Sequence, residues 1–236
     1  MGALASPADN LASLALTHVY YDPDSSFGLL SAFLALIPQA LLVAYATALY
    51  CRREAEIAWL FAGQLACEAL NWISKRAIKQ DRPQHVIGIG KGYGMPSSHA
   101  QFMGFFCVYA SCILLLRHRQ RLATTDIQRW RDWIHGIRAG TVVSVSFAVC
   151  LSRIYLAYHT VAQVLVGVGI GMVFGGIWFM VYEQLKQAGV VRWLCETQVA
   201  AVFLVRDTEY ETEVEQEWQR WRQAIQAEVH GRKKKR

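Results

Sequence analysis

The first 26 residues contain no lysine or arginine, and Asp9 and Asn10 interrupt their short apolar stretch. A cleaved signal peptide begins with a basic segment that leads into an unbroken apolar one, so we expect residues 1–26 to remain as an N-terminal segment. The six cysteines include no CxxC pair and no Cys/His pair at metal-ligand spacing. This pattern excludes the common zinc motifs, and we interpret the cysteines as small apolar packing residues.

Charge is scarce along much of the chain, and 54% of its residues are hydrophobic. A helix crosses a bilayer core with about 20 mostly apolar residues. Five segments approach this requirement: residues 27–50, 55–72, 101–116, 137–158 and 161–185. The second is the weakest because it carries Glu56, Gln64, Glu68 and Asn71, and the third needs its flanks. The sequence therefore predicts an all-α, polytopic membrane helix bundle with about five transmembrane helices over residues 27–185, followed by a tail, residues 186–236.

Basic residues gather in alternate loops, and this sets the predicted orientation. They follow the first segment at Arg52 and Arg53, the third as five arginines between positions 117 and 131, and the fifth in the last five residues. The positive-inside rule places these parts in the cytosol, so residues 1–26, the 75–98 loop and the turn at 153–160 are expected on the opposite side.

One loop breaks the rule, because five basic residues lie on the side expected to be non-cytosolic: Lys75, Arg76, Lys79, Arg82 and Lys91. A solvated surface cluster is one interpretation. Charges kept against the orientation bias favour the other interpretation, an anion-binding site.

The first motif within that loop is Lys75, six residues, then Arg82-Pro83. Positions seven apart share one face of a helix, and a proline ends the helix that precedes it. The spacing predicts two cations at a helix end near the membrane surface, where both can bind phosphate oxygens.

The second motif is Pro96-Ser97-Ser98-His99, at the start of the third apolar segment. Ser98 and Gln101 fit a capping box, which predicts a helix start at this point. The free N–H groups and positive dipole end of a helix N-terminus bind phosphate, and His99 is expected in that first turn.

The third motif is Ser152-Arg153, five residues, then His159. The short turn between the fourth and fifth segments is expected to bring Arg153 and His159 to the membrane face that carries His99. A neutral imidazole can attack phosphorus, and a second imidazole can protonate the leaving oxygen and then activate water. Cations neutralise the charge on the transferred phosphoryl group. The three motifs together therefore predict a phosphatase in the membrane.

In this order, the three motifs resemble the type 2 phosphatidic-acid phosphatase superfamily, which also includes vanadium haloperoxidases. Two positions depart from the family pattern, Ser98 in place of glycine and Gln163 in place of aspartate. The resemblance implies that His159 is the nucleophile and His99 the acid and base, with no metal and no cofactor. It also implies a set of phosphate-binding residues: Lys75, Arg82, Arg153, Ser97 and Ser98.

Two runs, residues 93–103 and 152–165, are similar to those of eukaryotic dolichyl-diphosphatases, a subfamily that also carries the glutamine. This likeness implies hydrolysis of dolichyl diphosphate to dolichyl phosphate and phosphate at the lumenal face of the endoplasmic reticulum, which recycles the lipid carrier of N-glycosylation. The expected partners are this lipid and the bilayer, with no nucleic acid. The alternatives are a phosphatase of phosphatidate or a sphingoid phosphate, and a non-catalytic lipid-binding protein.

Two polar residues have two interpretations each. Gln163 can accept a hydrogen bond from the His159 ring, or it can form a capping box with Thr160. Glu68 lies on the same helix face as Lys75. One interpretation is that it orients Lys75 or Arg153; the other is that it makes polar contacts between helices.

Other residues are assigned to packing and anchoring. The row Gly167, Gly171 and Gly175 predicts close helix packing. Membrane-interface anchors or isoprenoid contacts are expected at three aromatic positions, Trp72, Tyr155 and Tyr158.

The tail carries two further signals. An apolar stripe on a charged helix predicts docking on the membrane surface, or alternatively on a partner helix; its residues are Val214, Trp218, Trp221, Ile225 and Val229. The last four residues, 233–236, resemble a dilysine retrieval signal, and a basic patch for anionic lipid is the alternative.

Overall fold

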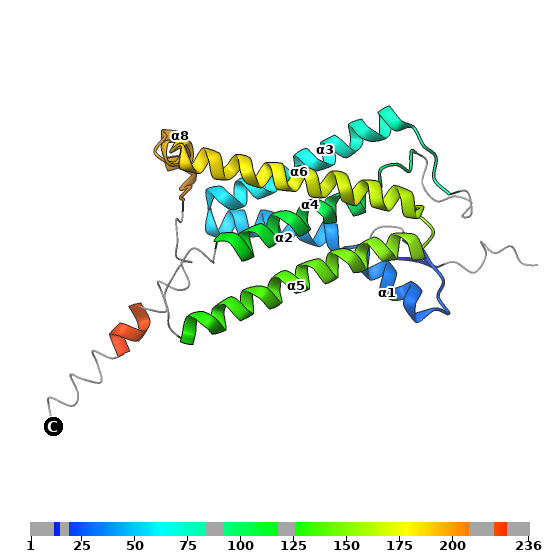
Figure 1. Ribbon diagram of the computed structural model, residues 1–236, viewed down its shortest axis with the longest axis horizontal. Coiled ribbons are helices and arrows are strands. Elements are labelled where there is room, and N and C mark those ends of the chain that lie inside the picture. The colour runs from blue at the N-terminus through cyan, green and yellow to red at the C-terminus, as the bar shows by residue number, and fades with distance from the viewer. Residues whose placement is uncertain (1–11, 15–18, 84–91, 118–125, 208–219, 226–236) are drawn as a thin grey trace, which may run out of the picture.

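The computed structural model describes residues 12–14, 19–83, 92–117, 126–207 and 220–225. Long helices lie side by side along one axis (Figure 1). The main elements are α1 (Ser26–Leu34), α2 (Ile37–Arg52), α3 (Ala55–Ile78), α4 (Ser98–Cys112), a π-helical turn (Ile113–Arg117), α5 (Asp126–Tyr155) and α6 (Val161–Gln187). Short helices α7 (Val190–Cys195) and α8 (Gln198–Phe203) follow, and residues 220–225 are helical. Near the N-terminus, β1 (Ala12–Leu14) pairs antiparallel with β2 (Val19–Tyr21).

The predicted fold class, a polytopic helical membrane bundle, is confirmed. In the described part of the chain, four helical segments are long and apolar enough to cross a membrane: Ser26–Arg52, Ser98–Leu116, Trp133–Tyr155 and Val161–Gln187. The second expected span, residues 55–72, lies in α3, which has 24 residues, or about 36 Å of helix. Its length suffices, but its charged residues leave it less apolar than the other four.

The first expected span is not one continuous helix. It breaks at Ala35 and Leu36, and α1 stands at an angle to α2 (Figure 1). Pro38 lies in the first turn of α2, where its missing N–H has no helical partner to lose. The Ser31 and Phe33 carbonyls still accept from the N–H groups of Ala35 and Leu36. The Ala35 carbonyl, which follows the last residue of α1, lies outside the ladders of both helices.

The closest helix pair is α4 and α6, and glycines make its approach possible. A Cβ added at Gly167 would lie 2.7 Å from the Ser97 carbonyl oxygen, and one at Gly175 would lie 2.9 Å from that of Phe105. At Gly171 it would overlap the Gln101 carbonyl. The predicted packing role of this glycine row is confirmed.

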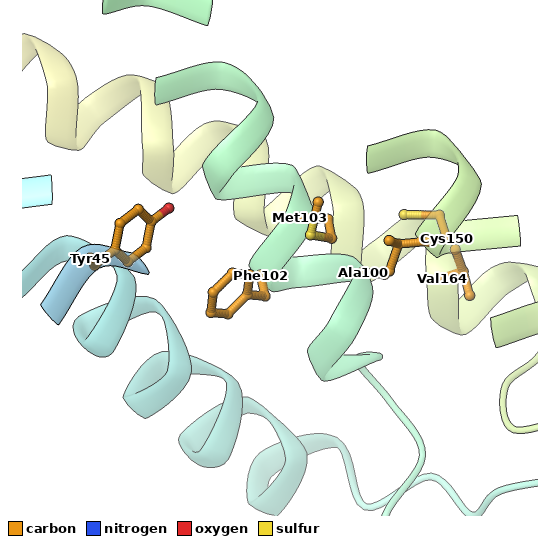
Figure 2. Packing of buried hydrophobic residues seen from close by; sticks show 7 residues of the cluster. Tyr45, Ala100, Phe102, Met103, Cys150 and Val164 are labelled. Atoms are coloured by element: carbon orange, nitrogen blue, oxygen red, sulfur yellow. The ribbon is translucent and has the colours of Figure 1, made fainter. Parts of the chain in front are cut away.

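Apolar side chains from several helices meet against α4 (Figure 2). Tyr45 of α2 and Cys150 of α5 approach Phe102 and Met103 from different sides. Cys67 and Cys150 are buried free thiols among apolar neighbours, so the packing interpretation is confirmed for these two cysteines. Burial of this apolar surface holds the helix ends in fixed relative positions.

The two ends of the bundle differ in what they bring together. The C-terminal ends of α3 and α5 and the N-terminal ends of α4 and α6 lie at the right in Figure 1. At the other end the chain after α8 returns to the α2–α3 junction, where the Arg206 N–H donates to the Arg53 carbonyl at 2.9 Å. Of the predicted tail stripe only Trp221 and Ile225 are described, and both are exposed. The other stripe residues and residues 233–236 lie outside the described ranges.

We predict that Gly171→Ala destabilises the protein by about 1–3 kcal/mol, because the added methyl group overpacks the α4–α6 contact. The matched control is Gly169→Ala on the same helix, where an added Cβ meets nothing within 4 Å. Thermal unfolding in detergent measures both variants. Equal midpoints for the two would contradict the packing role.

Candidate active site

The first motif does not form the helix predicted for it. α3 ends at Ile78, and Lys79 adopts a left-handed conformation with φ of 52°. Arg82 therefore lies in the loop after α3, four residues past the helix end, and does not share a helical face with Lys75. The helix stops well before Pro83, so the proline is not the cause of its end.

The second motif starts α4 as predicted, but without the predicted capping box. Ser97 is the N-cap residue and makes no side-chain cap hydrogen bond. Gln101 instead turns toward α3, where its amide accepts from Asn71 Nδ2 at 2.8 Å and donates to the Cys67 carbonyl at 3.0 Å. A buried amide needs hydrogen-bond partners. The partners of Gln101 are on α3, so its side chain links α3 to α4 and does not cap the start of α4.

The third motif lies in the turn from α5 to α6. Arg153 is in the last turn of α5, and the N–H groups of Tyr158 and His159 both approach its carbonyl, at 3.2 and 3.3 Å. The Thr160–Gln163 capping box is confirmed, since each side chain bonds the other residue's backbone N–H at 3.2 Å. The box fixes the start of α6 directly after His159.

These segments enclose a cavity of about 180 Å³. Its lining includes five of the predicted site residues: Arg82, Ser98, His99, Arg153 and His159. Lys75 and Ser97 are not on this lining. Lys75 is near enough to act electrostatically on Arg82 and His159. Buried Ser97 ties the two helix starts together, since its N–H donates to the Gln163 carbonyl at 3.1 Å.

The cavity is cationic, because two arginines, Arg82 and Arg153, line it. Arg153 is only 4% exposed. Among the described residues, no partner reaches the buried Nε and Nη1 atoms of Arg153 or the Nε atom of Arg82. Buried donors need acceptors, and a guanidinium fork suits phosphate oxygens. The arrangement is that of an anion-binding pocket.

The hydrogen bonds of His159 fix its tautomer. Its Nδ1 lies 3.2 Å from Gln163 Oε1. The amide orientation is set independently, because Gln163 Nε2 donates to the Asp81 carbonyl at 2.9 Å. Oε1 can only accept, so Nδ1 carries the proton and Nε2 keeps its lone pair. Gln163 thus makes both interactions that the sequence left as alternatives.

The electrostatic surroundings of His159 also keep it neutral. Its side chain is buried, and only 3% of the residue is exposed. Burial, reinforced by the neighbouring Arg153 guanidinium, lowers the pKa of His159 to about 4. A depressed pKa favours the uncharged ring at pH 7, so the imidazole is in its nucleophilic form.

His99 is held by the break between α1 and α2. Its Nε2 lies 3.1 Å from the Ala35 carbonyl oxygen, which is free of the helical ladder because α1 ends there. Since a carbonyl only accepts, Nε2 carries the proton in this contact. His99 therefore lines the same cavity as His159 with a defined ring orientation.

A second cavity, of about 220 Å³, adjoins the first and shares Gln39, Ser98 and His99 with it. Its other lining residues are mostly apolar: Pro38, Leu42, Phe102 and the carboxylate Glu68. Glu68 interacts electrostatically with Lys75, but no salt bridge within 4.0 Å joins these two described residues. Its stripe neighbours Gln64 and Asn71 donate to carbonyls of Phe102 and Pro96, each at 3.4 Å.

Sequence reasoning missed several residues around the pocket. Tyr158, read as an interface anchor or isoprenoid contact, is 8% exposed, and its ring lies under the Arg153 guanidinium at 4.3 Å. A Cβ at Gly94 would lie 2.8 Å from Gln163 Nε2, so a side chain at this position would have to displace the Gln163 amide. Val19 and Ala35 line the cavity from far away in the chain, and no local sequence pattern indicated this.

Two oriented imidazoles and two guanidinium groups line a small cavity at one end of a membrane bundle, and groups of these kinds can bind a phosphoryl group and transfer it. The chain belongs to the PAP2 superfamily, whose profile matches residues 39–187. This segment contains every residue that the sequence assigned to the site.

The relatives extend beyond that segment. The chain is 40% identical to "Putative dolichyldiphosphatase" of Neurospora crassa, over 96% of this chain and 99% of that protein. It is 37% identical to human "Dolichyldiphosphatase 1", over 82% and 80%. The yeast Saccharomyces cerevisiae "Dolichyldiphosphatase" is 31% identical over 87% and 85%. A PAP2-type phosphatidylglycerolphosphate phosphatase from Bacillus subtilis, solved by crystallography, aligns with a TM-score of 0.48 and 19% identity over 66% of this chain and 76% of that one.

We predict that Arg153→Gln weakens binding of inorganic phosphate by about 10- to 100-fold, because a hydrogen bond to a charged group contributes about 1.5–3 kcal/mol. Titration calorimetry on the purified protein measures the affinity. Arg76→Gln is the control, since Arg76 is exposed and stacks on Trp72 at 3.3 Å. Unchanged affinity in Arg153→Gln would rule out the pocket as the phosphate site.

Proposed function

We propose that the protein hydrolyses dolichyl diphosphate to dolichyl phosphate and phosphate. The observation that carries this proposal is the pair of oriented imidazoles, His99 and His159, that line one cavity with Arg82 and Arg153. The names of the relatives support the choice of substrate, since three of them, from separate fungi and human, carry the word dolichyldiphosphatase.

In the proposed reaction, His159 Nε2 attacks the terminal phosphorus. A P–N bond forms and the bond from phosphorus to the bridging oxygen breaks. A protonated His99 gives its Nδ1 proton to the leaving dolichyl phosphate, while its Nε2–H stays on the Ala35 carbonyl. Water, deprotonated by His99, then attacks the phosphohistidine and releases phosphate. Arg82, Arg153 and the start of α4 neutralise the charge on the transferred group, with Lys75 acting at longer range.

The neighbouring cavity supports a lipid substrate. It opens from the same Ser98 and His99 and is lined by Leu42, Phe102 and Pro38. An apolar chain that leaves the phosphate pocket on this side meets apolar side chains and gains from their burial. We assign the first isoprenoid units to this cavity and a supporting role beside Lys75 to Glu68.

The cellular setting follows from the same substrate. We propose that the catalytic end faces the lumen of the endoplasmic reticulum, that the tail is cytosolic, and that the enzyme recycles the lipid carrier of N-glycosylation. The positive-inside bias of the loops supports this orientation. The proposed units are residues 1–26 as a non-cytosolic segment, 27–185 as the catalytic bundle and 186–236 as the tail.

We expect purified protein to release phosphate from dolichyl diphosphate with a higher kcat/KM than from phosphatidate or a sphingoid phosphate, measured side by side. His159→Ala should abolish turnover on all three, because it removes the nucleophile. A preference for phosphatidate would overturn the substrate, and turnover by His159→Ala would overturn the phosphohistidine mechanism. No turnover of any lipid by the wild type would favour a non-catalytic lipid-binding role.

Gln163→Ala should lower kcat by about two orders of magnitude or more, because the nucleophile loses the group that fixes its tautomer. Thr160→Ala is the matched control. It removes the cap oxygen at a cost of about 1 kcal/mol in stability but leaves Gln163 in place, so kcat should stay close to wild type. Equal losses of kcat in both variants would show that Gln163 acts only through the helix cap.

A further inference from the structure

Part of the phosphate pocket comes from outside the family segment. Val19 and Ala35 line the cavity, whereas the family match begins at residue 39. The two residues belong to one stretch, residues 19–35, formed by β2, a turn and α1. We call this stretch the N-terminal cover.

The cover has a small core of its own against the α5–α6 turn. Val19, Ala32 and Ala35 are buried together with Leu156 and Tyr158. Two tyrosine hydroxyls fasten it further. The Tyr20 N–H donates to the Tyr158 hydroxyl at 2.9 Å, and Ser25 Oγ lies 2.9 Å from the Tyr155 hydroxyl. The cover is therefore a packed element with defined contacts.

The cover also contacts the groups proposed to do the chemistry. The Ala35 carbonyl holds the His99 ring. Tyr158, which binds the cover through its hydroxyl, presents its ring to the Arg153 guanidinium. Tyr158 thus contacts both the cover and Arg153. A shift of the cover would therefore move Tyr158 and alter the wall of the pocket beside Arg153.

The two cavities indicate what the cover faces. The second cavity, to which the first isoprenoid units are assigned, shares Gln39, Ser98 and His99 with the phosphate pocket, so the lipid chain leaves across these residues. Val19 and Tyr158 belong to the lining of the phosphate pocket but not to that of the second cavity. A substituent on the distal phosphate would point away from the lipid chain. It would therefore meet the part of the pocket wall that Val19 and Tyr158 form.

We propose that the N-terminal cover makes the pocket selective for a terminal phosphate that carries no further substituent, with Val19 as the limiting side chain and Tyr158 as its fastening. This inference rests on the proposed phosphatase function and deepens it. A lipid diphosphate whose distal phosphate bears another group is excluded, so the enzyme spares substituted lipid diphosphates in the same membrane.

The test compares a polyprenyl diphosphate with the same lipid methylated on its distal phosphate, and measures the ratio of their kcat/KM values. Wild type should cleave only the free form at an appreciable rate. Val19→Gly and Tyr158→Phe should each shift the ratio toward the methylated lipid by about tenfold or more, the scale on which a pocket discriminates one carbon. In those variants His159 displaces polyprenyl phosphate from the methylated phosphorus, and water then releases methyl phosphate.

Tyr155→Phe is the matched control, since it removes the cover contact that lies outside the cavity lining, and its ratio should equal that of wild type. An unshifted ratio in both Val19→Gly and Tyr158→Phe would overturn the proposal, as would efficient cleavage of the methylated lipid by wild type. If the enzyme prefers phosphatidate, the substrate proposal fails separately. The same ratio is then measured with phosphatidate and its methyl ester, and the cover is still tested.

Discussion

The close approach of α4 and α6 is the constraint on which the site depends. Their backbones meet across Gly167, Gly171 and Gly175, where side chains would collide with α4 carbonyls. The contact continues to the helix starts, where the Ser97 N–H donates to the Gln163 carbonyl. His99 and His159 lie at those two starts, so packing between helices sets the distance between two imidazoles. Sub-ångström placement matters for phosphoryl transfer, which relies mainly on positioning.

Gln163 shows how a neutral side chain can serve where the family pattern has aspartate. A carboxylate could accept from His159, but it could not donate to the Asp81 carbonyl as the amide does at 2.9 Å. The amide therefore joins His159, the start of α6 and the loop that carries Arg82. Compared with aspartate, the neutral glutamine stabilises an imidazolium less, but it connects the three segments more firmly. A lipid phosphate is a weaker base than an alkoxide, and we infer that such a leaving group tolerates the exchange.

The sequence predicted the parts of the site that depend on contacts between residues close in the chain or on regular spacing along a helix. The glycine row and the Thr160–Gln163 box follow from helical periodicity, and both are confirmed. The errors occur where a distant partner competes with a local pattern. Gln101 could cap its own helix, but Asn71 and Cys67 of α3 offer a buried amide better-satisfied hydrogen bonds. Two other differences are that α3 ends at Ile78, before Arg82, and that the expected first span breaks at Ala35.

That break also explains why the pocket could be predicted only in part. In an unbroken helix from Phe27 to Tyr50, the Ala35 carbonyl would have accepted from the N–H of Gln39 and would not have been offered to His99. Because α1 turns away at Ala35, the Ala35 carbonyl is available to His99 at the cavity, and α1 packs on the α5–α6 turn. A hydropathy pattern registers both arrangements identically, since the residues are apolar in either case. The three sequence motifs therefore indicate the chemistry, whereas the cavity wall around them is set by tertiary packing that no single segment encodes.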